Sequence, residues 1–360
     1  MAFFIIAGLI MLGMQVIIGL WVYFSFPAAG WKIPALAAPL VLTLFMRWAM
    51  VYTRTHYGTW EGTLYYAAYT WAGLVFIFFS IILAFACLQG LCWLLKLNIR
   101  HILVPLSWAV MALAAAAALY GGFSRPKIKH VDVVIPGAPE MTVAVISDSH
   151  LGNGVSLSRF QNALERIQAQ NPDAVFVLGD LFEYGMHRQK YAQALASVQT
   201  KYGSFGVLGN HEYYVGYDNS VDFYKKSGIE LLQNKTHTLP NGLQLIGIND
   251  YKTTGMTDER LDKIFSASDP KRPRVLLSHQ PLAADRAAAN NIPLTLSGHT
   301  HNGQIFPFNF VVRMTTPYVY GLYQTGKYSL IYVTSGMFYW GLPLRLLAPA
   351  EIPLIHIKGS

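Results

Sequence analysis

The chain is poor in charged residues and almost devoid of cysteine. Charged side chains make up 13% of its 360 residues and hydrophobic ones 53%, with a mean hydropathy of +0.33. Since soluble domains usually carry about 25% charged residues, this composition excludes an ordinary soluble protein. The shortage of charge is concentrated before residue 121, where Glu61 is the only acidic residue.

Both cysteines, Cys87 and Cys92, lie in this apolar first part. The chain from residue 121 onward has none, which excludes a disulfide framework and a thiolate metal site there. The net charge of +8 does not indicate nucleic-acid binding either. After residue 120 the 22 basic and 18 acidic residues are spread along the sequence without a long basic run, as on a solvated surface. We therefore expect no nucleic-acid partner.

Four long apolar stretches fill the first 120 residues, at 2–26, 33–52, 65–95 and 102–120. Each reaches about the 20 residues that a helix needs to cross a bilayer. A cleaved signal peptide is the alternative for the first stretch, but it lacks a basic start and a clear small-residue cleavage site. We expect a transmembrane module of four helices at 1–120.

The charges beside the expected spans leave the orientation open. With four spans, the N-terminus and the region after residue 120 share one side of the membrane. The basic residues on that side are slightly more numerous, which favours the cytoplasm, whereas Lys32 directly after the first span favours the opposite arrangement. The cluster Arg125, Lys127 and Lys129 suits either contact with anionic lipid headgroups or a simple juxtamembrane anchor.

Apolar runs of strand length alternate with helical patterns after residue 120, which predicts an α/β domain. The expected strands are 142–147, 174–179, 205–209, 243–248, 274–278 and 294–298. The expected helices are 156–170, 188–200, 219–228, 257–266 and 282–290. About 220 residues at 141–360 suffice for one domain with its own core, and 121–140 is expected to be a linker and the entry to it.

Five polar motifs follow these strands at the point where each apolar run ends. They are Asp148-Ser149-His150, Gly179-Asp180-Leu181-Phe182-Glu183, Gly209-Asn210-His211-Glu212, Ser278-His279 and Gly298-His299-Thr300-His301. Ligand sites of open α/β sheets collect at the carboxyl ends of strands, so these side chains are expected to share one crevice. Carboxylate oxygens, an amide oxygen and imidazoles suit a pair of divalent ions such as Mn²⁺, Zn²⁺ or Fe²⁺, and a metal pair serves displacement at phosphorus.

In this order the motifs resemble those of the calcineurin-like metallophosphoesterase superfamily, D-x-H, G-D-x-x-(D/E), G-N-H-(E/D), H and G-H-x-H. The tail at 298–304 and Pro349-Ala350-Glu351-Ile352 resemble its YkuE/YaeI-type phosphodiesterase branch. The resemblance covers 141–360 but not the expected membrane spans. It implies a four-layer α/β/β/α sandwich.

The resemblance also implies a role for each motif residue. One metal would take Asp148, His150 and His301, and the other would take Asn210, His279 and His299. Asp180 would bridge both metals together with a solvent hydroxide that attacks phosphorus. His211 would stabilise the phosphate or protonate the leaving oxygen, while Glu183 and Glu212 would support these residues from outside the coordination shell.

The stretch 305–347 is rich in apolar and aromatic residues but too short to span a bilayer. Two of its segments, 305–310 and 337–342, would either form an apolar collar beside the metal site that enters the membrane interface or binds an acyl chain, or cover the sheet or pack against the membrane helices. Together with the spans, they suggest a multi-pass enzyme of the bacterial inner membrane that hydrolyses a phosphomonoester or phosphodiester in a lipid or lipid-linked headgroup. The alternatives are a tethered phosphodiesterase for soluble substrates and a non-catalytic metal-binding scaffold. The sequence leaves the oligomeric state open.

Overall fold

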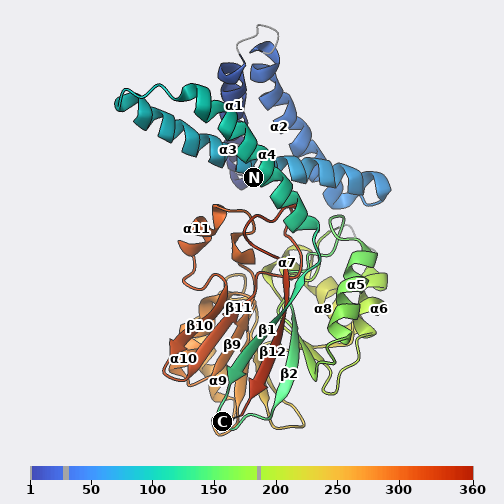
Figure 1. Cartoon of the computed structure of the whole chain (residues 1–360). Helices are drawn as coiled ribbons and strands as arrows, with labels where there is room; N and C mark the ends of the chain where they lie inside the picture. The colour runs from blue at the N-terminus through green and yellow to red at the C-terminus, as the bar shows by residue number, and fades with distance from the viewer. Residues whose placement is uncertain (1, 27–31, 185–187, 360) are drawn as a thin grey trace. The chain divides into compact units, whose positions relative to one another are not determined.

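The structure is a computed structural model that describes residues 2–26, 32–184 and 188–359. Its contacts divide the chain into two compact units (Figure 1). The first comprises Met1–Phe123, Ile305–Pro307 and Gly341–Leu347, and the second comprises Ser124–Gln304, Phe308–Trp340 and Ala348–Ser360. The two later segments of the first unit lie far along the sequence from its helices.

The described residues of the first unit form four helices, α1 (Ala2–Ser25), α2 (Lys32–Thr55), α3 (Thr59–Leu94) and α4 (Arg100–Phe123). A buried polar side chain of α1 is paired with side chains of α2 and α3. Gln15 donates to the Thr43 hydroxyl over 2.6 Å and accepts from the Trp71 indole over 3.1 Å. Buried polar groups in an apolar environment need such partners, and the bonds fix α1 against α2 and α3.

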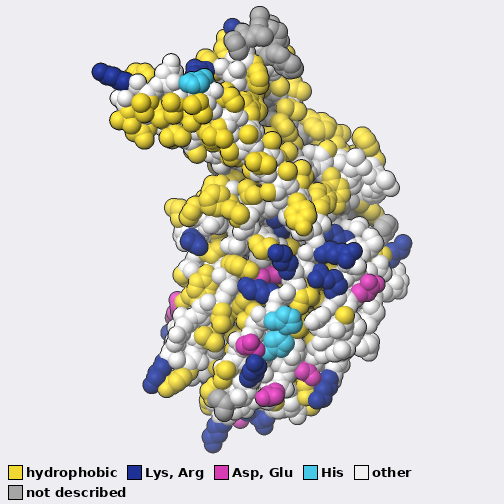
Figure 2. Space-filling view, in the orientation of Figure 1, with side chains coloured by type: hydrophobic (Ala, Val, Ile, Leu, Met, Phe, Trp, Pro, Cys, Tyr) yellow, Lys and Arg dark blue, Asp and Glu magenta, His cyan; other side chains and the backbone are white. Residues whose placement is uncertain are grey.

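Three of the described helical segments are long and apolar enough to cross a membrane, Ile5–Ser25, Thr59–Leu94 and Arg100–Phe123. Large apolar side chains on them, such as Leu9 and Leu113, are more than half exposed, which suits contact with lipid rather than water. Figure 2 shows hydrophobic side chains over much of these helices. The fourth expected span, 33–52, corresponds to α2, where the side chains of residues 33 and 36 lie outside the described part, and it stays a prediction.

The two late segments of the first unit pack among its helices. Ile305 and Leu344 are buried in one cluster with Ile77 of α3 and Ala118 of α4. Leu344 follows Pro343, whose carbonyl oxygen would lie 2.1 Å from a Cβ added to Gly122, so only glycine permits this approach. For these parts of 305–347, packing against the helices is the arrangement that the structure contains.

Within the part of the second unit that the structure describes, the strands form two six-stranded sheets. The first has the order β1 (Lys127–Val134), β12 (Glu351–Lys358), β2 (Met141–Ile146), β3 (Ala174–Val177), β4 (Ser204–Gly206), β5 (Ile229–Leu231). The second has the order β10 (Gly321–Gly326), β11 (Ser329–Val333), β9 (Leu294–Ser297), β8 (Arg274–Leu277), β7 (Gln244–Gly247), β6 (Lys235–Thr238). β2 to β5 run parallel, as do β7, β8, β9 and β11, so several carboxyl ends meet at one edge of each sheet.

The sheets and their covering helices form four layers. Between the sheets, Val143 and Phe176 of the first share a core with Leu277 and Leu296 of the second. On the outer faces lie α5 (Leu157–Gln168), α6 (Arg188–Ala196) and α8 (Tyr217–Lys226) for the first sheet, and α9 (Asp258–Ser266) and α10 (Ala284–Ala289) for the second. The predicted α/β/β/α sandwich is confirmed.

α5 illustrates how the sequence sets these layers. The Ser156 hydroxyl caps the helix by accepting from the Arg159 N–H over 3.3 Å. Phe160, Ala163 and Ile167 then recur at intervals of three and four residues and are all buried against the first sheet. The short helices α7 (Asn210–Tyr214) and α11 (Phe308–Arg313) complete the unit.

Candidate metal centre

The predicted ligands come from loops at the carboxyl ends of strands in both sheets. Asp148 and His150 follow β2, Asp180 follows β3, and Asn210 opens α7 after β4. From the second sheet, His279 follows β8, and His299 and His301 follow β9. All are buried except His299, which is half-buried. The structure brings all seven predicted ligands together.

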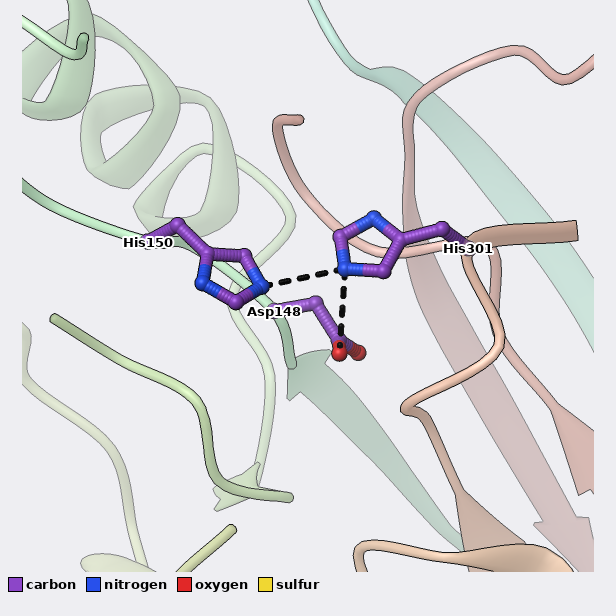
Figure 3. Close-up of side chains that lie close together, drawn as sticks. All are labelled: Asp148, His150 and His301. Carbon is purple, nitrogen blue, oxygen red and sulfur yellow. Dashed lines mark hydrogen bonds and ion pairs between the residues drawn. The ribbon is translucent and has the colours of Figure 1, made fainter. Parts of the chain in front are cut away.

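Asp148, His150 and His301 form the first group of side chains (Figure 3). The His150 Nε2 and His301 Nε2 atoms lie 3.0 Å apart, and His301 Nε2 lies 3.4 Å from Asp148 Oδ1. Two imidazole nitrogens and one carboxylate oxygen therefore face a common point, as the ligands of one cation would.

A second group is centred on His279. Its Nε2 lies 3.2 Å from Asp180 Oδ2, 3.2 Å from Asn210 Oδ1 and 3.1 Å from His299 Nδ1. The same Asp180 oxygen lies 3.9 Å from His150 Nε2 in the first group. Asp180 thus stands between the two groups, where a shared ligand would have to be.

The chemistry of the donors fits divalent metals. His279 Nδ1 lies 2.8 Å from the Leu178 carbonyl oxygen, so the ring is held with Nε2 directed into the second group. Burial and the neighbouring His279 lower the pKa of His299 to about 3, which keeps a lone pair available. Burial lowers the pKa of His279, but the Asp180 carboxylate outweighs it and raises the pKa to about 10. The site attracts a positive charge, which a metal ion would supply.

The backbone at these ligands is unusual. Five of the seven have φ in the left-handed region although none is glycine: Asp148 (53°), His150 (42°), Asp180 (52°), His299 (72°) and His301 (49°). A non-glycine residue held in this conformation raises the free energy of the folded state by about 1–3 kcal/mol, and such residues are concentrated at functional sites. This backbone conformation turns the chain sharply at the ligands, so that side chains close in sequence can face the same ligand group.

Two of the flanking glycines leave space for ligand carboxylates. A Cβ on Gly209 would lie 2.2 Å from Asp180 Oδ1, and one on Gly298 would lie 2.3 Å from Asp148 Oδ2. Any side chain at either position would displace a carboxylate. Glu212 fixes the same loops, since its carboxylate accepts from the N–H groups of Asp180 (2.9 Å), Leu181 (2.7 Å) and Gly209 (2.7 Å).

Glu183 contacts two histidines at once. Its Oε1 lies 2.7 Å from His150 Nδ1 and 2.6 Å from His211 Nδ1. Burial raises the pKa of Glu183, but its bonds to the two histidines outweigh burial and lower the pKa to about 2. Burial lowers the pKa of His211, but the Asp180 and Glu183 carboxylates outweigh it and raise the pKa to about 9. His211 is therefore positioned, protonated, beside both groups of ligands, with Nε2 3.9 Å from Asp180 Oδ2.

Trp340 is a further neighbour of His211, and it lies in 337–342, one of the two segments considered as an apolar collar beside the metal site. The Trp340 ring lies 5.9 Å from the His211 ring, although the two residues are far apart along the chain. The segment before Trp340 also touches the first motif, because the Met337 N–H donates to the Ser147 carbonyl oxygen over 2.8 Å. Its aromatic composition was the only signal in the sequence.

Comparison with known proteins identifies the family. A family model described as calcineurin-like phosphoesterase matches residues 141–303. The uncharacterized metallophosphoesterase YkuE of Bacillus subtilis is 30% identical over 298 residues, which cover 74% of this chain and 99% of that protein. The chain belongs to the calcineurin-like metallophosphoesterases. The predicted superfamily and its YkuE-type relatives are thereby confirmed.

Two further relatives are also named as metallophosphoesterases, and the name of one of them describes a transmembrane protein. An uncharacterized metallophosphoesterase of Campylobacter jejuni is 33% identical over 249 residues, covering 68% of this chain and 66%, just under two thirds, of that protein. A transmembrane protein with metallophosphoesterase domain from Danio rerio is 30% identical over 276 residues, 71% of this chain and 62% of that protein. Together with the three apolar helices, this likeness supports membrane association.

Proposed function

We propose that this metallophosphoesterase is a multi-pass enzyme of a bacterial inner membrane that hydrolyses a phosphomonoester or phosphodiester in a lipid or lipid-linked headgroup. The observation that carries the proposal is the pair of ligand groups that meet at Asp180 with His211 beside them. Three apolar helices and a transmembrane relative support a substrate that is itself in the membrane.

The ligand assignment follows the two groups. One divalent ion would be held by Asp148, His150 and His301, and a second by Asn210, His279 and His299, with Asp180 shared between them. Bound Mn²⁺, Zn²⁺ or Fe²⁺ would supply Lewis acidity toward the phosphoryl oxygens and lower the pKa of a coordinated water.

His211 is the residue that handles the leaving group in this proposal. Glu183 accepts its Nδ1–H, so the opposite nitrogen, Nε2, faces the ligand groups and can donate a proton to the departing alkoxide. Because Glu183 also holds His150, the same carboxylate aligns a metal ligand and the proton donor. The buried Glu212 keeps the loops that carry Asp180 and His211 at a fixed separation.

The test uses the full-length protein in detergent, loaded with Mn²⁺ or Zn²⁺, with bis-p-nitrophenyl phosphate, p-nitrophenyl phosphate and a phospholipid panel as substrates. We expect Asp180→Ala to lose bound metal and turnover, and His211→Ala to keep its metal but lose roughly 100- to 10,000-fold in kcat. Asp222→Ala on α8, a surface carboxylate paired with Lys226, is the matched control that should change neither.

The outcomes separate the alternatives. Turnover of soluble diesters but of no lipid would make the protein a tethered phosphodiesterase for soluble substrates. Two bound metals without turnover of any panel member would make it a metal-binding scaffold. Full activity of the Asp180→Ala variant would refute the proposed site itself.

A further inference from the structure

Two half-exposed aromatic rings flank His211. The Tyr214 ring centroid lies 5.3 Å from that of His211, with the rings inclined at 63°. The Trp340 ring centroid lies 5.9 Å away, inclined at 75°. Tyr214 is 59% exposed and Trp340 53% exposed, so both present apolar surface to solvent beside the histidine.

The position of Trp340 is fixed by its main chain. The Gln304 side chain accepts from the Trp340 N–H over 2.8 Å and donates to the Trp340 carbonyl oxygen over 3.1 Å. Gln304 is buried and follows the ligand His301 by three residues. These two bonds fix the main chain of Trp340 beside the site. From that backbone position the indole reaches the His211 ring and stays half-exposed.

The main chain of Tyr214 is hydrogen-bonded by a third exposed aromatic residue. The Tyr184 hydroxyl donates to the Tyr214 carbonyl oxygen, and Tyr184 is itself 42% exposed. We name Tyr184, Tyr214 and Trp340 the aromatic rim. A single exposed aromatic residue needs no explanation. Two exposed rings that flank one proton donor, with a third aromatic residue hydrogen-bonded to the main chain of one of them, make a surface suited to an apolar group.

We propose that the aromatic rim is the leaving-group subsite and that it binds the acyl-bearing alcohol of a lipid phosphoester. This inference rests on the proposed function, in which His211 protonates the leaving oxygen, so whatever departs must lie against the rings that flank it. Flat rings would also accept a nucleobase, but the membrane-spanning helices favour an acyl chain, which reaches the enzyme from the bilayer.

The kinetic test compares two phosphate esters with the same reacting bond, glycerol 3-phosphate and 1-acylglycerol 3-phosphate, and the corresponding ethanolamine diesters, in the same mixed micelles. The measured quantity is the ratio of kcat/KM with and without the acyl chain. We expect Trp340→Ala to lower this ratio about 10-fold, the effect of truncating an aromatic binding residue, and Trp340→Phe to restore most of it. Tyr328→Ala, an exposed aromatic in the turn between β10 and β11, should leave it unchanged.

A binding measurement needs no turnover. Titration calorimetry with the product-like alcohol monoacylglycerol should show about 10-fold weaker binding to Trp340→Ala and to Tyr214→Ala than to the parent, with glycerol and a nucleoside as comparison ligands. If the variants bind monoacylglycerol more weakly than the parent but the parent turns over no ester, the binding subsite is upheld and the proposed function is refuted. Equal losses of kcat/KM on acyl and non-acyl esters with unchanged monoacylglycerol binding, or preferential binding of the nucleoside, would overturn the subsite.

Discussion

Replacing Glu183 by Gln should damage metal binding and proton transfer together. The carboxylate Oε1 contacts His150 Nδ1 at 2.7 Å and His211 Nδ1 at 2.6 Å. A hydrogen bond with a charged partner contributes about 1.5–3 kcal/mol. Glutamine keeps the shape but removes the charge from both bonds, so each histidine loses a comparable part of its orientation.

The two effects can be measured separately. Loss of the His150 bond should weaken metal affinity by roughly 10- to 150-fold, and loss of the His211 bond should lower kcat by a similar factor once metal is saturating. Metal titration followed by mass spectrometry gives the first number, and turnover of bis-p-nitrophenyl phosphate gives the second. Glu183→Asp, shorter by one methylene, cannot span both histidines and should show one defect more strongly than the other.

A Glu183→Gln variant with parental metal content and parental kcat would refute this reasoning, because both contacts would then be without consequence. A defect that disappears at saturating metal would assign Glu183 to His150 alone. Unfolding temperature serves as the control, since a variant that is merely misfolded should lose stability as well as activity.

Three further predictions test the surroundings of the site. Glu212→Ala should lower the free energy of unfolding by more than about 3 kcal/mol, because three buried N–H groups lose their acceptor. Denaturant titration would measure this free energy, and a decrease of less than about 1 kcal/mol would contradict the prediction. Gly298→Ala should reduce bound metal because its Cβ would overlap Asp148, whereas Gly90→Ala, with open space around it, should leave the metal content intact. Chelation should lower the unfolding temperature and re-addition restore it, since a ligand at about 100 times its Kd stabilises by about 2.7 kcal/mol; an unchanged melting curve would argue against a metal in the folded unit.

Much of the second unit could be predicted because its central strands lie in mainly apolar runs that are followed by polar residues. β2, β3, β7, β8 and β9 begin and end within two residues of the expected runs, and β4 ends three residues before the end of its expected run. Since five of these strands are followed directly by a motif, the site followed from the same pattern. The buried lining of a parallel sheet makes such strands visible in the sequence.

The strands that were not predicted depend on distant partners. β12 lies between β1 and β2, and its Pro353 pairs with Lys129. A proline inside a run argues against a strand, and no local window contains both β1 and β12. β6 is polar, with the sequence Lys235-Thr236-His237-Thr238, and gains its structure from pairing with β7.

The contacts made by aromatic side chains were equally inaccessible. Trp340 meets His211 only because β11 and the loop after it return to the first motif, where the Met337 N–H bonds the Ser147 carbonyl oxygen. The roles suggested for 305–347 stayed open for the same reason. Ile305 and Leu344 are buried among helices whose residues precede them by more than 180 positions, a separation that composition cannot bridge.

That late packing has a consequence for how the protein is made. Translation delivers α1 to α4 first, and Ile305 and Leu344 leave the ribosome only after most of the two sheets has been synthesised. Until these late segments are synthesised, α3 and α4 lack the side chains that pack against Ile77 and Ala118 in the complete chain. A fragment that ends at residue 123 would lack Ile305 and Leu344, which pack against its helices. A fragment that begins at residue 124 would contain these two apolar residues without the helices that bury them. The two halves of the gene should accordingly fail when expressed apart and recover when expressed as one chain.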